Sequence, residues 1–380
     1  MTTTVATPGR NTVLSICKGI AIILMVIGHA ECPGMLCNFI YLFHMPVFFI
    51  AAGYFFSRKY LSDPWTFVVK RFRGLYVPFV KWSVLFLLLH NVLFYFGILN
   101  EQYGNWEGGV LHPYTWHDMA FRISAIVFSM GGYDEFMAGA FWFFRALLLS
   151  SILFLVLDLL VERHVPRMQG VRAVWLILLA ALAFALFKIS NNVKIVTVVQ
   201  GGIREVWGVA FFAIGVLYRT YEQRIREHWA LTLAYLALLI GAAWLHCAGM
   251  NLKPKPIDVL TLPITGTIGF LMVHHVSKVI DSRGGILRRF LVMCGDMSVY
   301  IYVFHIASFK LVSLLKIAVY NLDFAQIGCH MVIHYRNDDL FWVLYTIAGV
   351  GIPMLWMCVY RKISARLMRA KSYSSRGGKV

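Results

Sequence analysis

Charged residues are scarce in this chain, and acidic ones are the scarcest. Asp, Glu, Lys and Arg make up 14% of the 380 residues, with 18 acidic against 35 basic side chains, while hydrophobic residues make up 59%. Soluble globular domains carry about 25% charged residues. A chain with this composition and a mean hydropathy of +0.70 is therefore not an ordinary soluble protein. We predict an integral membrane protein.

Nucleotide and metal motifs are also missing. The sequence holds no Walker loop and no Rossmann glycine pattern placed between a strand and a helix. His112 with His117, and Cys329 with His330 and His334, have spacings that suit a metal, yet no paired ligand set of the usual zinc form accompanies them. We interpret these residues as loop residues and predict no metal site.

Long apolar runs, in contrast, are abundant. Windows near twenty residues, the length that crosses a bilayer, predict ten spans: 11–31, 38–56, 74–98, 137–161, 172–188, 203–218, 229–249, 258–277, 291–315 and 340–360. The sixth is the weakest, because Arg204 and Glu205 lie at its edge. The first twelve residues lack a signal-peptide cleavage pattern, so we keep the first run as a span. We predict an all-α bundle of about ten transmembrane helices, a single domain over 1–380 with tails at 1–10 and 362–380. The longest break, 99–136, is predicted to be a loop.

The basic residues predict an orientation. The two tails and the loops after the second, fourth, sixth and eighth spans hold most of the Lys and Arg. The positive-inside rule therefore places both termini in the cytoplasm and the 99–136 loop outside. A net charge of +17 is also found in nucleic-acid-binding proteins. Gathered at one face of a membrane bundle, it indicates contact with anionic lipid headgroups instead, so we predict membrane lipids and no nucleic acid as partners.

Several polar residues interrupt the apolar spans. Lys18 and His29 are eleven positions apart, which places them on one face of a helix at depths that differ by about 16 Å. With the predicted orientation, His29, His44, Arg145 and His305 all fall in the outer half of the bundle. Ionisable residues within spans face a protein interior or a water-filled cavity. We therefore predict that four spans direct these groups to one outer-leaflet cavity.

The chain holds five informative segments in register: Lys18 to His29, 43–56, 70–79, 141–148 and 295–305. Together they resemble the acyltransferase-3 family of membrane acyltransferases. Lys18 and His29 match that family's signature of a basic residue, ten residues and a histidine, although the basic residue is often Arg and many members have Asp where Ser15 stands. The other four segments, which extend the likeness over most of the chain, are FHMPVFFIAAGYFF (43–56), KRFRGLYVPF (70–79), FWFFRALL (141–148) and GDMSVYIYVFH (295–305). The family acylates sugars of envelope polysaccharides, glycolipids or related acceptors.

Acyl transfer to a sugar hydroxyl needs a base, because an alcohol is a poor nucleophile at neutral pH. His29 is our candidate base, and the alternative is a packing histidine hydrogen-bonded to a neighbouring span. His44 is a candidate for aligning the substrates, and Arg145 or His305 for stabilising the developing oxyanion. For each of these three residues, an interhelical hydrogen bond is the alternative.

The resemblance implies a coenzyme A donor that enters from the cytoplasm, with acetyl-CoA as the expected form. Lys18, Lys70, Arg71 and Arg73 are candidates for holding its phosphates, whereas anchoring by the positive-inside rule is the alternative. The expected acceptor is a hydroxyl of an envelope polysaccharide or glycolipid precursor, at the inner (plasma) membrane. A competing interpretation is a transporter or flippase for a lipid-linked glycan, in which the same charged residues line a path and no bond is made.

Overall fold

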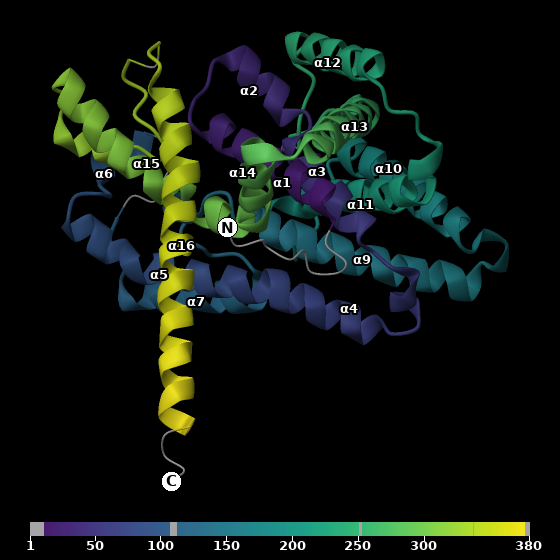
Figure 1. Ribbon diagram of the computed structural model, residues 1–380, viewed down its shortest axis with the longest axis horizontal. Helices are drawn as coiled ribbons and strands as arrows, with labels where there is room; N and C mark the ends of the chain where they lie inside the picture. Colours follow the sequence, from purple (N-terminus) through teal and green to yellow (C-terminus); the bar gives the residue numbers. More distant parts are fainter. Residues whose placement is uncertain (1–10, 107–111, 251–252, 337, 377–380) are drawn as a thin grey trace.

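The computed structural model describes residues 11–106, 112–250, 253–336 and 338–376, which fold into helices without a strand (Figure 1). In chain order the α-helices are α1 (Thr12–His29), α2 (Gly34–Tyr41), α3 (His44–Tyr54), α4 (Pro64–Arg71), α5 (Val77–Tyr95), α6 (Glu101–Trp106), α7 (Trp116–Ser129), α8 (Glu135–Ala138), α9 (Trp142–His164), α10 (Val171–Ser190), α11 (Ile203–Tyr221), α12 (Trp229–Trp244), α13 (Asp258–Arg283), α14 (Gly285–Asp296), α15 (Ser298–Tyr320) and α16 (Phe341–Arg376).

Each of the ten predicted spans coincides with helical structure. Within the described residues, eight helical segments are long and apolar enough to cross a membrane, which confirms the all-α polytopic fold. The other two are α12, which is apolar but has only 16 residues, and α11, which has 19 residues and includes Arg204, Glu205 and Arg219. Most residues of α11 are buried. Neighbouring helices therefore surround it, and an apolar surface on every side is not required.

Helix α1 lies in the middle of the bundle. It contacts α2, α3, α13, α14, α15 and α16. Its crossing with α14 depends on Gly19 and Gly295, because a Cβ on either residue would overlap a backbone carbonyl of the other helix. Small residues of this kind let membrane helices approach closely. The crossing fixes the first half of α1, and therefore Lys18, against α14.

Helices α3 and α11 cross in the same way. A Cβ at Gly53 would overlap the backbone carbonyl of Phe212, and a Cβ at Gly215 would overlap that of Ile50. Helix α3 begins at His44 and α11 begins at Ile203. This crossing therefore sets where the first residues of both helices lie.

The third predicted span begins earlier than expected. The side chain of Asp63 caps α4 by accepting a hydrogen bond from the Thr66 N–H at 3.2 Å. The helix then continues through a π-helical segment, η2 (Phe72–Tyr76), into α5. The predicted span 74–98 is thus the later part of a 32-residue helical run, Pro64–Tyr95. π-Helical turns are frequent at functional sites, and η2 directly follows Arg71.

The 99–136 segment is not simply a loop. It contains α6, α7 and the start of α8, so the prediction of a loop is wrong for those stretches. Helix α7 starts with a capping box, in which Thr115 and Asp118 each bond the other's backbone N–H. The hydrogen bonds from Thr115 also lower the pKa of Asp118. Helix α7 packs against α5.

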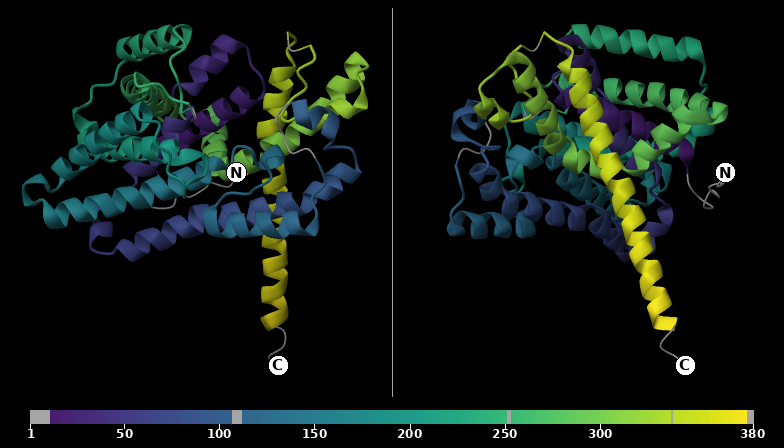
Figure 2. Two further views of the ribbon diagram at one scale, coloured as in Figure 1. Left: turned by 180° about the vertical axis from the view of Figure 1, so that it is seen from behind. Right: turned by 60° about the vertical axis from the view of Figure 1, so that its left-hand side comes forward.

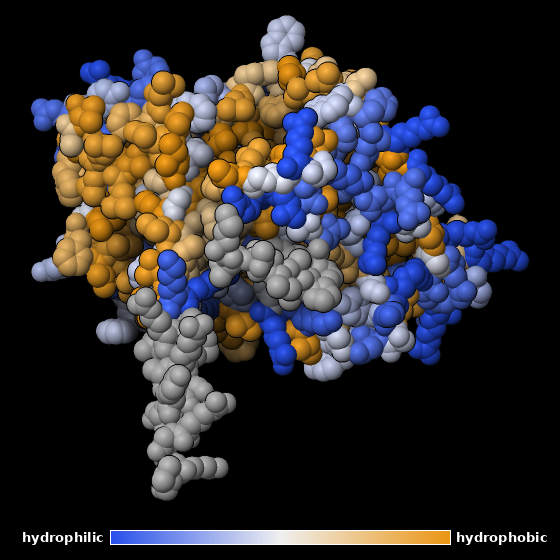
Figure 3. All heavy atoms as spheres, in the orientation of Figure 1, coloured by the Kyte–Doolittle hydropathy of each residue, from blue (hydrophilic) through white to orange (hydrophobic). Residues whose placement is uncertain are grey.

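The last helix extends well past its predicted end at 360. Helix α16 continues to Arg376, into the predicted tail, and its C-terminal part projects beyond the other helices (Figures 1 and 2). The surface is uneven in polarity. In Figure 3, hydrophobic side chains gather on the side where α15 lies, whereas hydrophilic ones gather over the ends of α4 and α9. A broad apolar face of this kind suits contact with lipid.

Candidate active site

Two histidines from opposite ends of the sequence form the centre of the candidate site. His29 is the last residue of α1, and His305 lies within α15. Nδ1 of His29 and Nε2 of His305 are 2.8 Å apart, and the two rings stack with centroids 5.1 Å apart. His305 is 1% exposed, whereas His29 is half-buried. The structure thus brings two of the predicted site residues into direct contact.

A backbone carbonyl sets the direction of this hydrogen bond. Nδ1 of His305 lies 2.8 Å from the carbonyl oxygen of Tyr302. Because a carbonyl can only accept, Nδ1 of His305 carries a proton, and Nε2 of the neutral ring is an acceptor. Nδ1 of His29 therefore donates to His305. These protons are assigned from the hydrogen-bond network. The network leaves Nε2 of neutral His29 as an unprotonated, basic nitrogen.

A cavity of about 170 Å³ lies beside His29, and we call it the His29 cavity. Its lining also includes His44, which is the first residue of α3 and is 3% exposed. Nδ1 of His44 donates to the carbonyl of Ile40 at 2.9 Å, so Nε2 of the neutral ring is an acceptor here too. The full lining is Met25, His29, Tyr41, His44, Met45, Ala140, Trp142, Arg204, Met250 and Tyr302.

The arginine of this cavity is not the predicted one. Arg145 is 2% exposed, and its Nε donates to Glu205 at 3.0 Å. Its other nitrogens donate to the carbonyls of Met130 and Val199. Arg145 is not among the residues that line the His29 cavity, and its contacts favour the alternative of an interhelical bond.

Arg204 lines the His29 cavity instead. Its guanidinium stacks on Trp142 at 3.9 Å from the ring centroid, and its Nε donates to the carbonyl of Met250 at 3.2 Å. Sequence reasoning noted Arg204 only as a charge that weakened a span. A charge at the edge of an apolar run was the available signal, but its neighbours come from α9 and from the loop before α13.

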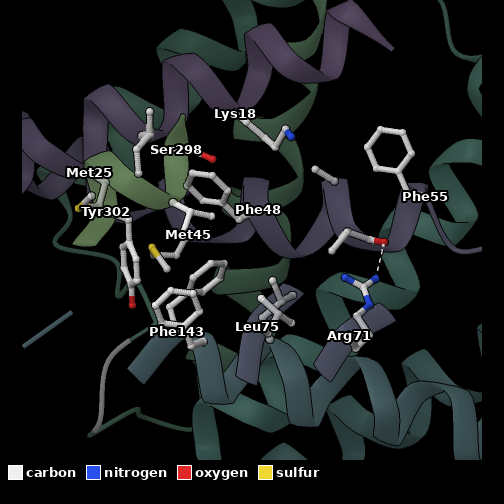
Figure 4. Close-up of a pocket in the computed structure, with 16 residues that line it drawn as sticks. Lys18, Met25, Met45, Phe48, Phe55, Arg71, Leu75, Phe143, Ser298 and Tyr302 are labelled. Carbon is white, nitrogen blue, oxygen red and sulfur yellow. Dashed lines mark hydrogen bonds between the residues drawn. The ribbon is translucent and has the colours of Figure 1, made fainter. Parts of the chain in front are cut away.

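A second cavity, of about 260 Å³, lies on the other side of Met25, Met45 and Tyr302, and we call it the Lys18 cavity. Lys18 and Arg71 supply its basic groups (Figure 4). The rest of its lining is Ile22, Met25, Met45, Phe48, Ala51, Ala52, Phe55, Leu75, Phe143, Phe144, Leu147, Ser298, Val299 and Tyr302. Arg71 is held by a hydrogen bond from Nη2 to the carbonyl of Ala52 at 3.2 Å and by the ring of Phe67, 4.9 Å away.

The other two predicted donor-binding residues lie outside this lining. Lys70 and Arg73 are both exposed. The ammonium of Lys70 bonds the hydroxyl of Tyr60 at 3.3 Å. Of the predicted basic cluster, the structure therefore places Lys18 and Arg71 at one cavity and leaves Lys70 and Arg73 on the surface.

A separate group of ionisable residues joins α13 to the loop that follows α11. The loop residue Glu227 accepts hydrogen bonds from His274 at 2.9 Å and from Lys278 at 2.9 Å. Burial by itself raises the pKa of Glu227, but these hydrogen bonds and positive charges outweigh it and lower the pKa to about 2. None of these three residues lines either cavity. We interpret these hydrogen bonds and ion pairs as structural contacts that hold the loop against α13.

Loop residues considered as metal ligands are placed elsewhere in the fold. His334 pairs with Glu31, the residue two positions after His29, and His330 packs against Phe136. Across the described ranges, His, Cys, Asp and Glu form no group of three or more that is arranged to hold a metal.

A helix bundle of this kind, with a histidine pair at one cavity and basic residues at the next, defines a polytopic membrane protein with the groups needed for acid–base chemistry on a substrate. The chain belongs to the acyltransferase-3 family, because the family's acyltransferase domain matches residues 11–366. No curated protein and no solved structure matched the chain. The protein is thus a multi-pass membrane acyltransferase that uses an acyl donor and an acceptor, and the transporter interpretation is not favoured.

Proposed function

We propose that the protein transfers an acetyl group from acetyl-CoA to a hydroxyl of an envelope polysaccharide or glycolipid precursor. The observation that carries this proposal is the His29–His305 pair beside a cavity that adjoins the Lys18 cavity. His29 lines the cavity, and its Nε2 is the basic nitrogen that the hydrogen-bond network leaves unprotonated. That is the group that an alcohol acceptor needs.

In the proposed step, Nε2 of His29 takes the hydroxyl proton while the hydroxyl oxygen bonds to the carbonyl carbon of the thioester. His29 becomes an imidazolium whose Nδ1–H still donates to His305. As the carbon–sulfur bond breaks, the proton on Nε2 passes to the departing thiolate. The products are the ester and the free thiol of coenzyme A, and His29 returns to its neutral form.

Other residues of the His29 cavity fit supporting roles. A guanidinium carries five N–H donors in a fixed fork, so Arg204 suits the oxygen that becomes negative during the reaction. Neutral His44 offers Nε2 as an acceptor and suits alignment of the sugar through a second hydroxyl, because the reacting hydroxyl donates its single proton to His29. His305 does not line the cavity and contacts His29 directly. We therefore assign it as a positioning residue, in place of the oxyanion role predicted from sequence.

The donor would enter at the Lys18 cavity. Lys18 and Arg71 lie there with their charged groups in a half-buried setting, where charge-assisted hydrogen bonds to phosphate are strong. The apolar remainder of the lining suits the uncharged arm that carries the thioester. Acetyl is the acyl group that we propose.

We also propose that the protein lies in the inner (plasma) membrane with both termini, and hence the Lys18 end of the bundle, on the cytoplasmic side. The distribution of Lys and Arg supports this orientation. The test is single-cysteine labelling of intact cells with an impermeant reagent. Both Gln102 and Lys59 are exposed on the protein surface, so a difference in labelling reports the side of the membrane. Cysteine at position 102 should react, and cysteine at position 59 should not. The reverse pattern contradicts the orientation.

The test of the reaction is His29→Gln. Glutamine keeps much of the hydrogen bonding but has no basic nitrogen, and loss of a positioned base costs about 10²- to 10⁴-fold in rate. Acetylation of the envelope glycan, measured by mass spectrometry, should be lost, while expression and thermal stability should stay near normal.

The matched control is His275→Gln. Nδ1 of His275 lies 2.6 Å from the hydroxyl of Thr232 on α12, and neither residue lines either cavity. Such interhelical contacts contribute about 0.6 kcal/mol, so acetylation should be retained. A folded His29→Gln protein that acetylates at close to the normal rate rules out His29 as the base.

A further inference from the structure

Three residues belong to both cavities. Met25, Met45 and Tyr302 line the Lys18 cavity and the His29 cavity alike. In Figure 4 they lie together toward one end of the Lys18 cavity, away from Arg71 and Phe55. They therefore form a partition between the basic groups and the histidine pair. A group that passes from one cavity to the other at this shared lining passes between these side chains.

In this partition, contacts hold the side chain of Tyr302 in place, whereas the side chains of Met25 and Met45 can change conformation. Tyr302 is held by a hydrogen bond from its hydroxyl to the carbonyl of Ala140 and by ring contacts with Phe141 and Phe144, at centroid distances of 5.8 and 5.0 Å. Met25 and Met45 are 2% and 7% exposed. Methionine is unbranched and flexible, so these two side chains can adjust to a narrow group without a change in the backbone.

We infer that Met25, Met45 and Tyr302 select the acyl group of the donor by its length. The inference rests on the proposed function, in which the thioester moves from the Lys18 cavity toward His29. An acetyl group places only a methyl beside its carbonyl. A longer chain must push the two methionines aside or lie in the His29 cavity, whose volume of about 170 Å³ also has to hold the acceptor hydroxyl.

The test compares donors on the purified full-length protein. Release of the coenzyme A thiol is measured with acetyl-CoA and with butyryl-CoA, using as acceptor the envelope polysaccharide extracted from cells that lack this protein. In Met25→Ala/Met45→Ala, the ratio of kcat/KM for butyryl-CoA to that for acetyl-CoA should rise at least tenfold, because a single misfitting methylene changes selection by about 10- to 200-fold.

The matched control is Met250→Ala. Met250 lines the His29 cavity but not the Lys18 cavity, so the same truncation enlarges the space without opening the partition. This substitution should leave the butyryl-to-acetyl ratio unchanged, whatever it does to the rate. An equal rise in the ratio for Met250→Ala shows selection by cavity volume alone and overturns the inference.

Met45→Phe tests the partition from the opposite direction, and it also serves if the double variant does not fold. A bulkier and stiffer side chain should lower acetyl transfer at least tenfold while the Kd for acetyl-CoA is unchanged, because the basic groups of the Lys18 cavity remain. Normal transfer by Met45→Phe, or an unchanged donor ratio in the double variant, overturns the partition alone. No thiol release by the wild-type protein with either donor overturns the proposed function as well.

Discussion

Replacing His305 with Leu removes the nitrogen that accepts the hydrogen bond from His29, while the apolar leucine still fills the buried site. In the wild-type protein, Nδ1 of His29 lies 2.8 Å from Nε2 of His305. His305 accepts this hydrogen bond both from neutral His29 and from the imidazolium formed during the reaction. A hydrogen bond between neutral groups contributes about 0.5–1.5 kcal/mol, and one to a charged group about 1.5–3 kcal/mol. The loss is therefore greater in the transition state than in the resting enzyme.

The size of the effect follows from those figures. The difference between the two losses, about 1–1.5 kcal/mol, lowers kcat by about 5- to 13-fold, at 1.36 kcal/mol for each factor of ten. The decrease should appear in kcat, and KM for acetyl-CoA should change little, because Lys18 and Arg71 are untouched. His305→Gln offers an amide oxygen as a replacement acceptor and should recover part of the rate.

A double-variant cycle separates positioning from a general loss of structure. If His305 acts only through His29, adding His305→Leu to His29→Gln should slow the enzyme little further, because the base is already absent. The assay is the thiol-release measurement on detergent-purified protein, with thermal unfolding as the folding check. A His305→Leu rate within twofold of wild type would falsify the assignment, and so would a double variant slowed by the product of the two single effects.

Two further predictions concern donor binding and helix packing. Lys18→Ala and Arg71→Ala should each raise the Kd for acetyl-CoA by about 10- to 150-fold, which is the cost of one charge-assisted hydrogen bond. Lys70→Ala, at an exposed position, should leave the Kd unchanged, and calorimetry with purified protein measures all three. Equal effects at the three sites would show that only the overall positive charge matters, and not a donor site at Lys18 and Arg71. Gly215→Ala should lower the free energy of unfolding by about 1–3 kcal/mol, because the added methyl overpacks the α3–α11 crossing. Gly351→Ala is the control, since nothing lies within 4 Å of its added Cβ, and it should leave the melting temperature unchanged or raise it. Equal melting temperatures for the two variants contradict the packing argument.

Some features that the sequence analysis missed did have a local signal. Thr115 and Asp118 have the three-residue spacing of a capping box, which predicts a helix start where we expected a loop. Asp63 followed by Pro64 is likewise a helix-start pattern and marks the early beginning of the third span. Both signals are polar, and windows chosen for apolar residues pass over them.

Other features had no local signal. The choice between Arg145 and Arg204 depends on Glu205, which is adjacent in sequence to Arg204 but bonds Arg145 across 60 residues. A helix places neighbours such as Arg204 and Glu205 on different faces, so one faces the cavity and the other faces α9. The sequence contains both charges but not the rotation of α11 that separates their environments.

The sequence by itself determined the class and most of the helices, because crossing a bilayer requires about twenty apolar residues in one run and that requirement is local. The motif from Lys18 to His29 likewise specified two depths on one helix, since the rise per residue is constant. Only the tertiary structure decided that His29 meets His305 across 276 residues of chain. It also placed Lys18 and His29 in adjoining cavities divided by two methionines and a tyrosine. The close approach of the helices that carry these residues depends in part on glycines, as at the α1–α14 and α3–α11 crossings, where a Cβ would overlap a backbone carbonyl of the neighbouring helix.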